Sequence, residues 1–133
     1  FSANERAIYV SSIAKKEGID LFLSLHVNSL PTHPEFSRYE MDYFIDNPYA
    51  EALDVFCRDL ASGLDNESKI FADVYDEAFL VTKKGTHPSV LIEMGYATNE
   101  SDCKKLNSSE WRGEFAKTLA EACESWIASY EEK

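Results

Sequence analysis

Residues 89–96 have the sequence SVLIEMGY and directly follow Pro88. Their β-branched and aliphatic run is typical of a buried strand, and Gly95 marks the turn where the strand ends. Glu93 interrupts the run with a carboxylate, which is costly to bury unless a partner, a metal or a hydrogen-bond network compensates it. Two interpretations stay open: amides at the strand end satisfy Glu93, or Glu93 is an active-site acid.

A second strand is predicted at residues 19–28, which have the sequence IDLFLSLHVN. Leucine and valine occupy one face, whereas the other face becomes polar toward its end, where Ser24, His26 and Asn28 follow in line. Ligand sites of open α/β sheets lie beyond the carboxyl ends of the strands. A single histidine there is more often a hydrogen-bonded structural residue than a ligand. Together, however, His26 and Glu93 at two strand ends predict a shared site.

Composition and charge limit the classes of protein to which the chain can belong. With 133 residues, 44% hydrophobic and 28% charged, it suits one domain with a core of its own. No apolar run approaches the roughly 20 residues that span a bilayer, so we expect no membrane-embedded chain. The net charge of −11 argues against nucleic acid as a partner, because no Lys or Arg cluster exceeds a pair. The three cysteines predict no disulfide framework, and Cys57 and Cys123 are expected in the core.

Periodicity and capping residues predict a single domain over residues 1–133. A capping box of Ser2 and Glu5 begins the first helix, and Ser108 or Ser109 caps the last one. In chain order we expect a helix at 3–17, strands at 19–28 and 39–45, a helix capped by Asn47 with Pro48 in its first turn, a polar linker at 65–69, strands at 78–81 and 89–96, one helical turn at 102–106, and a final helix. This order indicates an α/β fold, namely a three-layer α/β/α sandwich with a mostly parallel mixed sheet of the phosphorylase/hydrolase-like kind.

The remaining histidines, His33 and His87, fall in predicted loops beside prolines. His87 lies at the end of its strand that is away from Glu93. We expect both imidazoles to be in solvent, and only closeness to His26 along the chain makes His33 a candidate for the site.

Three stretches of the chain match motifs of one enzyme family. After a helix that carries Arg6, residues 20–29 read DLFLSLHVNS, which is similar to ADLFISIHAN in that family. Residues 88–99 read PSVLIEMGYATN, which is similar to PAVLVExGFxSN, and residues 40–44 stand where the family has a GxEVYY strand. Along essentially its whole length, the chain thus resembles the zinc-dependent N-acetylmuramoyl-L-alanine amidases that cleave peptidoglycan.

The resemblance implies a zinc hydrolase that acts outside the cytoplasm, in the periplasm or cell wall, on the amide between N-acetylmuramic acid and L-alanine. His26 matches a zinc ligand, Glu93 matches the catalytic carboxylate, and Asn28 would support the residues around the metal. Zinc with three protein ligands leaves a position for water and lowers its pKa to about 7. Glu93 would take the proton of that water and pass it to the leaving amine.

The family also uses a histidine from a GHGG-like loop and a glutamate from the next helix, and neither aligns with this chain. A catalytic zinc site needs about three protein ligands. We therefore expect residues upstream of Phe1, including a strand beside the His26 strand, whose edge would otherwise be an aggregation hazard. The alternative is a catalytically inactive amidase-like domain that binds peptidoglycan or regulates a partner hydrolase. A flavodoxin-like domain ranks third, because the five glycines form no phosphate-binding cluster.

Overall fold

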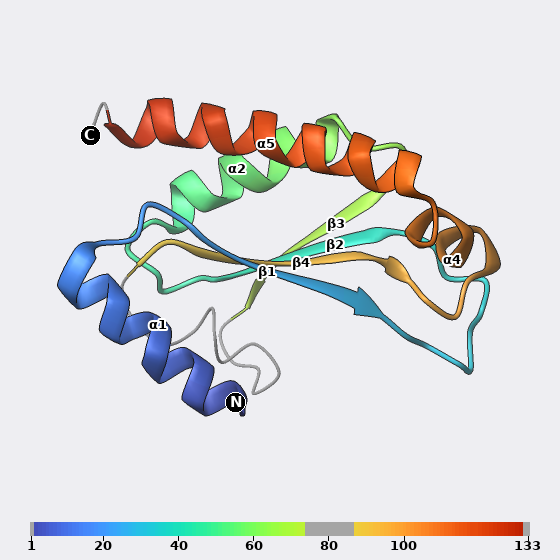
Figure 1. The fold of residues 1–133 in the computed structure, drawn as a ribbon, viewed down its shortest axis with the longest axis horizontal. Coiled ribbons are helices and arrows are strands. Elements are labelled where there is room, and N and C mark those ends of the chain that lie inside the picture. Colours follow the sequence, from blue (N-terminus) through green and yellow to red (C-terminus); the bar gives the residue numbers. More distant parts are fainter. Residues whose placement is uncertain (1, 74–86, 132–133) are drawn as a thin grey trace.

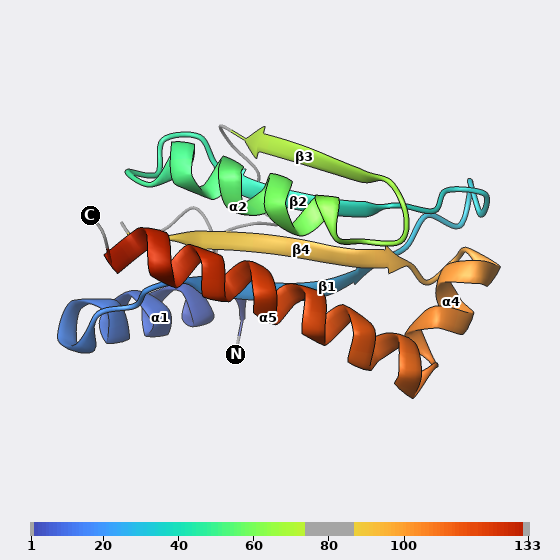
Figure 2. The ribbon, with the colours of Figure 1, turned by 90° about the horizontal axis from the view of Figure 1, so that it is seen from above.

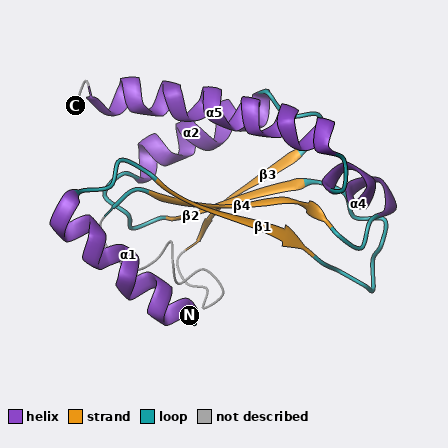
Figure 3. Ribbon diagram, viewed as in Figure 1, coloured by secondary structure: helices purple, strands orange, loops and turns teal. Residues whose placement is uncertain are grey.

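The computed structural model describes residues 2–73 and 87–131, so the strand predicted at 78–81 lies outside the described residues. Figure 1 shows the elements, which are, in chain order, α1 (Ala3–Glu17), β1 (Phe22–Asn28), β2 (Tyr39–Phe44), α2 (Ala50–Ser62), β3 (Ser68–Asp73), β4 (Ser89–Tyr96), α4 (Glu100–Leu106) and α5 (Ser109–Glu131). Seen by type of secondary structure in Figure 3, helices and strands are interspersed along the chain, as predicted for an α/β protein.

The described strands form one mixed sheet of four strands in the order β1-β4-β2-β3. β1 pairs with β4 and β2 pairs with β3 in parallel, whereas β2 and β4 are antiparallel. Helix α2 connects the parallel strands β2 and β3, because parallel neighbours need a crossover and cannot be joined by a tight turn. Two of the three pairings are therefore parallel, which confirms the mostly parallel mixed sheet.

Helices cover both faces of the sheet and make three layers. Helices α2 and α5 lie together on one face, and α1 lies on the other face (Figures 1 and 2). The predicted capping box of α1 is present, since Ser2 Oγ accepts from the N–H of Glu5 (3.1 Å) and the N–H of Ser2 donates to Glu5 Oε1 (3.2 Å). The predicted α/β/α sandwich is confirmed.

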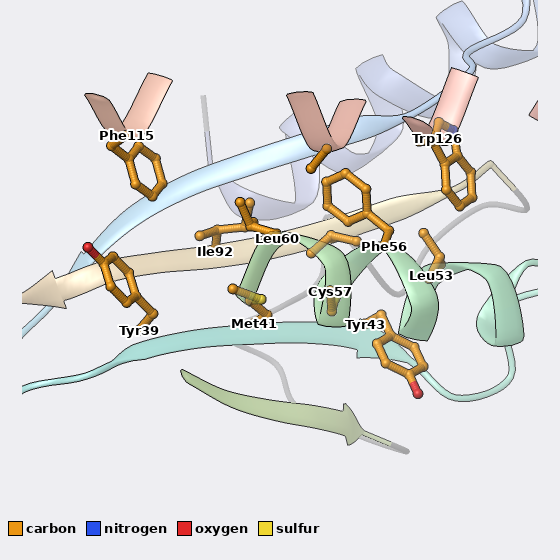
Figure 4. Close-up of a cluster of buried hydrophobic side chains, with 12 residues drawn as sticks. Tyr39, Met41, Tyr43, Leu53, Phe56, Cys57, Leu60, Ile92, Phe115 and Trp126 are labelled. Atoms are coloured by element: carbon orange, nitrogen blue, oxygen red, sulfur yellow. The ribbon is translucent and has the colours of Figure 1, made fainter. Parts of the chain in front are cut away.

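The main core lies between the sheet and helices α2 and α5 (Figure 4). It takes alternate residues of β2 and β4 and the apolar stripes of the two helices: Tyr39, Met41, Tyr43, Leu53, Phe56, Cys57, Leu60, Val90, Ile92, Phe115, Ala122 and Trp126. Cys123 packs against this cluster, so both cysteines predicted in the core are found there. Because neighbouring residues of a strand point to opposite faces, the residues between these core positions point away from α2 and α5. We call that opposite side of the sheet the site face.

The segment after α2 differs from its prediction. The sequence predicts a polar linker at residues 65–69, but β3 begins at Ser68 and runs parallel to β2. The polar residues at its start hide the strand in the sequence. Pairing with β2, rather than a pattern of its own, makes this segment a strand.

The start of α2 also differs from its prediction. The helix begins at Ala50, after Tyr49, which makes no side-chain cap bond. Asn47 does not cap the helix but shapes the turn before it, where Asn47 Oδ1 accepts from the N–H of Tyr49 (2.8 Å). Asn47 Nδ2 donates to the carbonyl of His87 (2.9 Å), so this buried amide joins the turn after β2 to the residues that precede β4.

Side-chain caps begin the last two helices. Asn99 Oδ1 accepts from the N–H of Asp102, and α4 starts at Glu100, two residues before the predicted helical turn. Ser108 Oγ accepts from the N–H of Trp111 (3.2 Å), which confirms Ser108 as one of the two predicted caps of α5. None of the described helices has both the length and the apolar character needed to cross a membrane.

Strand β1 lies at one edge of the sheet that the described strands form. Its apolar residues Leu25 and Val27 alternate with the polar residues of the site face and therefore lie on the opposite face, toward the core. They are nevertheless 48% and 44% exposed. The expectation that a further strand covers this edge stays a prediction.

Candidate functional site

His26 and Glu93 lie directly opposite each other on the parallel strands β1 and β4. Their Cα atoms are partners in the strand register. Partners on neighbouring strands project to the same face, and Ile92, next to Glu93, faces the core. Both side chains are therefore on the site face, near the carboxyl ends of their strands. The structure therefore brings His26 and Glu93 together, as predicted. Their chemical roles stay predictions.

Glu40 of β2 continues this line on the other side of Glu93, and the two Cα atoms are partners in the antiparallel register. We call His26, Glu93 and Glu40 the site row. Sequence reasoning missed Glu40, because it lies at the amino end of β2 and only the antiparallel pairing brings that end beside the carboxyl end of β4. The one signal for it was the glutamate of the GxEVYY pattern, which falls at position 40.

Three donors hold the carboxylate of Glu40, whose side chain is only 14% exposed. Arg38 Nε donates to Oε2 (2.9 Å), the hydroxyl of Tyr96 donates to the same oxygen, and Asn28 Nδ2 donates to Oε1 (3.2 Å). Asn28 thus contacts Glu40 from the end of β1. Its predicted support of a metal shell at His26 stays a prediction.

Glu93 is the member of the site row with a buried oxygen that no described residue compensates. Its Oε2 is buried and makes no hydrogen bond in the described part of the chain, so amides at the strand end do not satisfy this oxygen. Burial, with a smaller contribution from the negative charge of Glu40, raises the pKa of Glu93 to about 7. A carboxyl with a pKa near neutrality gains and loses protons under physiological conditions, which suits a general acid–base catalyst.

The imidazole of His26 is hydrogen-bonded to a neighbour on its own strand. Ser24 Oγ lies 2.8 Å from His26 Nε2, so a metal at Nε2 would require this hydroxyl to turn away. Among residues 2–73 and 87–131, no three His, Cys, Asp or Glu side chains form a group that could hold a metal ion. His26 fits a zinc site as one ligand, but the described residues do not complete such a site.

The other two histidines lie apart from the site row. His33 is in an exposed loop, as predicted, with Nδ1 3.0 Å from Glu35 Oε1. The predicted exposure of His87 is wrong, since His87 is only 7% exposed and its ring meets the edge of Phe22 at 6.1 Å between centroids. Neither ring nitrogen has a hydrogen-bond partner among the described residues, and burial lowers the pKa of His87. Phe22, distant in the sequence, thus contacts a buried residue whose local pattern is that of a loop.

Glu93 gives the metal-free protein a pH dependence of stability. Its pKa rises from a usual value of 4.5 to about 7 on folding, so the unfolded chain loses this proton first as the pH rises. The free energy of unfolding should therefore fall between about pH 4.5 and pH 7, and the loss is complete above pH 7. With allowance for solvent screening of this half-buried group, the loss is about 1–2 kcal/mol. Urea unfolding in the presence of a chelator measures the free energy of unfolding of Glu93→Gln and of the wild type. The value for Glu93→Gln minus that for the wild type should be larger at pH 8 than at pH 4 by this amount. An equal difference at both pH values would contradict this.

Comparison with known proteins defines the class to which this fold and site row belong. The family model for N-acetylmuramoyl-L-alanine amidase matches residues 4–125. The chain therefore belongs to the N-acetylmuramoyl-L-alanine amidase family.

Individual relatives agree with this assignment. The chain is 32% identical over 109 residues to the uncharacterized protein YqiI of Bacillus subtilis, a match that covers 80% of this chain and 51% of that protein. It is 32% identical over 129 residues to an uncharacterized cell wall amidase of Bacillus anthracis, covering 90% of this chain and 22% of that protein. The chain thus spans about half or less of the length of these relatives. The crystal structure of an N-acetylmuramoyl-L-alanine amidase from Clostridium difficile 630 has the same fold, with a TM-score of 0.79 at 19% identity over 97% of this chain and 67% of that one.

Proposed function

We propose that the protein is a peptidoglycan amidase that hydrolyses the amide between N-acetylmuramic acid and L-alanine, outside the cytoplasm. The observation that carries this proposal is the site row, in which a histidine lies beside a carboxyl at the ends of parallel strands, and one buried oxygen of that carboxyl has no hydrogen-bond partner among the described residues. Membership of the amidase family supports the substrate class.

Glu93 acts in this proposal as the general base. Its carboxylate accepts a proton from the attacking water and gives that proton to the leaving nitrogen of L-alanine, so both halves of the hydrolysis use one group. The pKa of about 7 lets the same carboxyl accept and donate without a large cost in either direction. Three donors hold the carboxylate of Glu40 beside Glu93, and its negative charge adds to burial in favouring the protonated form of Glu93 that the second step needs.

Zinc is part of the proposal as the cofactor, with His26 as one of its ligands. When bound, zinc would polarise the scissile carbonyl and acidify the attacking water. The described residues supply no group of three ligands, so the other ligands would come from outside them. The placement of Glu93 and Glu40 on neighbouring strands and the burial of Glu93 support the roles proposed for them.

The lack of a three-ligand group among residues 2–73 and 87–131 also fits a second candidate function. A catalytically inactive member of the family would keep the fold and the site face and would bind peptidoglycan or regulate a partner hydrolase. Metal content and cleavage distinguish the two functions.

The test is metal analysis together with muropeptide cleavage by the full-length protein. We expect about one zinc per chain, and we expect His26→Ala to weaken zinc binding by roughly 10-fold or more and to lower cleavage accordingly. His33→Ala is the matched control, because that imidazole is exposed and lies apart from the site row. Protein that carries no zinc and binds peptidoglycan without cleaving it would establish the second candidate instead.

A further inference from the structure

Arg38 lies next to the site row, and the mechanism above uses it only to hold Glu40. Its Nε donates to Glu40 Oε2 (2.9 Å), and its guanidinium lies over the ring of Phe36, 5.7 Å from the ring centroid. Phe36 in turn packs on Tyr96, with 6.1 Å between ring centroids, and the hydroxyl of Tyr96 donates to Glu40. The guanidinium is therefore held in place from two sides before any ligand arrives.

A guanidinium held in this way still has donors to offer. Arginine has five N–H groups in a planar fork that matches the two oxygens of a carboxylate. Glu40 Oε2 takes the Nε donor, and the nearby Tyr96 oxygen cannot occupy all of the others. The side chain of Arg38 is 28% exposed, so its remaining N–H groups can meet a ligand.

The position of Arg38 suits the peptide part of the proposed substrate. Glu40 lies one strand away from Glu93, and Arg38 lies two residues before Glu40. Strands about 4.8 Å apart and a rise of about 3.3 Å per residue place the Cα atoms of Arg38 and Glu93 roughly 8 Å apart. An extended peptide advances about 3.3–3.6 Å per residue, so the first or second residue after a scissile amide at Glu93 comes within reach of Arg38.

The negative charge around Arg38 makes its guanidinium important for the binding of an anionic ligand. The chain has a net charge of −11, and the site row itself contains two carboxyl groups, so the site face repels anions. In the part of the chain that the structure describes, Arg38 is the only cationic side chain with an ion pair to a member of the site row. Position 38 falls on the glycine of the GxEVYY pattern, so the guanidinium is a feature of this chain and not of that pattern.

We propose that Arg38 binds a carboxylate of the substrate peptide, on the residue that follows L-alanine, and thereby makes the site prefer acidic peptides over amidated ones. This inference rests on the proposed function, because it names the substrate chemistry of the same site. Arg38 is a specificity-determining residue here, and the chemistry of bond cleavage stays with Glu93.

The test compares two N-acetylmuramoyl-L-alanyl peptides that differ only in whether the carboxyl group of the second residue is free or amidated. We expect the full-length protein to cleave the free acid with a kcat/KM about 10- to 100-fold higher, the range for a hydrogen-bonded pair with a charged group. In Arg38→Gln the ratio of the two kcat/KM values should fall to near 1, and Arg38→Lys should keep part of the preference. Arg58→Gln is the matched control, because Arg58 is 69% exposed on α2, on the other side of the sheet.

The ratio separates recognition from damage to the site. A loss of Glu40 positioning lowers cleavage of both peptides equally and leaves the ratio unchanged, so an unchanged ratio in Arg38→Gln overturns the proposal. A wild-type ratio near 1 overturns it as well. Where the wild type cleaves neither peptide, the proposed function fails, and calorimetric affinities for the two peptides decide the inference alone. A higher affinity of the wild type for the free acid that is lost in Arg38→Gln supports the inference. Equal affinities of the wild type for the two peptides overturn it.

Discussion

Replacing Glu93 with Gln should lower the kcat of muropeptide cleavage by about 10²- to 10⁴-fold, the usual contribution of a general acid–base group. Glutamine keeps the size and the hydrogen-bonding reach of the side chain but cannot take a proton from water. The KM should change little, because the proposed role of Glu93 is proton transfer and not binding of the peptide. Steady-state kinetics on the full-length protein measures both quantities.

Glu100→Gln is the control for this substitution. Glu100 begins α4, its side chain is 88% exposed, and its ion pair with Lys104 (3.4 Å) is far too exposed to matter for the site. The control should retain the activity of the wild type. Cleavage by Glu93→Gln within threefold of the wild-type rate would show that another group supplies the base.

Replacing Leu60 with Ala should cost about 2–5 kcal/mol of the free energy of unfolding, a large effect on stability for a single core substitution. Leu60 is 0% exposed and belongs to the cluster that α2 and α5 form with the sheet (Figure 4). Alanine removes its buried methyl groups and leaves a cavity that the surrounding side chains and strands fill only in part. Urea or thermal unfolding measures the loss.

Val55→Ala on the same helix is the matched control, since Val55 is 58% exposed and its truncation leaves no cavity. Its free energy of unfolding should stay within about 0.5 kcal/mol of the wild type. A loss below about 1 kcal/mol in Leu60→Ala would mean that the space between α2 and the sheet is not the main core.

Local sequence patterns predicted the parts of the fold and site that depend on neighbours in the chain. The alternation around His26 and the apolar run around Glu93 each indicate a strand with a polar residue near its carboxyl end. The carboxyl ends of parallel strands meet at one edge of a sheet, so the sequence predicts a shared site for the two residues. That β1 and β4 are direct neighbours comes from the structure. The capping box of α1 and the α/β layers are predictable for the same reason.

The parts that could not be predicted depend on contacts between distant segments. Glu40 joins the site row only because β2 runs antiparallel to β4, and nothing near residue 40 specifies that direction. His87 is buried and contacts Phe22 of β1, which the loop-like sequence around His87 does not reveal. The strand from Ser68 likewise exists through its pairing with β2.

The buried amide of Asn47 also bears on the chemical lifetime of the protein. Asparagine residues deamidate when the backbone nitrogen of the next residue attacks the side-chain carbonyl carbon, and this step needs an N–H at that nitrogen. The next residue is Pro48, which has none. The bond from Asn47 Nδ2 to the carbonyl of His87 is thereby protected from the spontaneous conversion to aspartate that would replace its donor with a second acceptor.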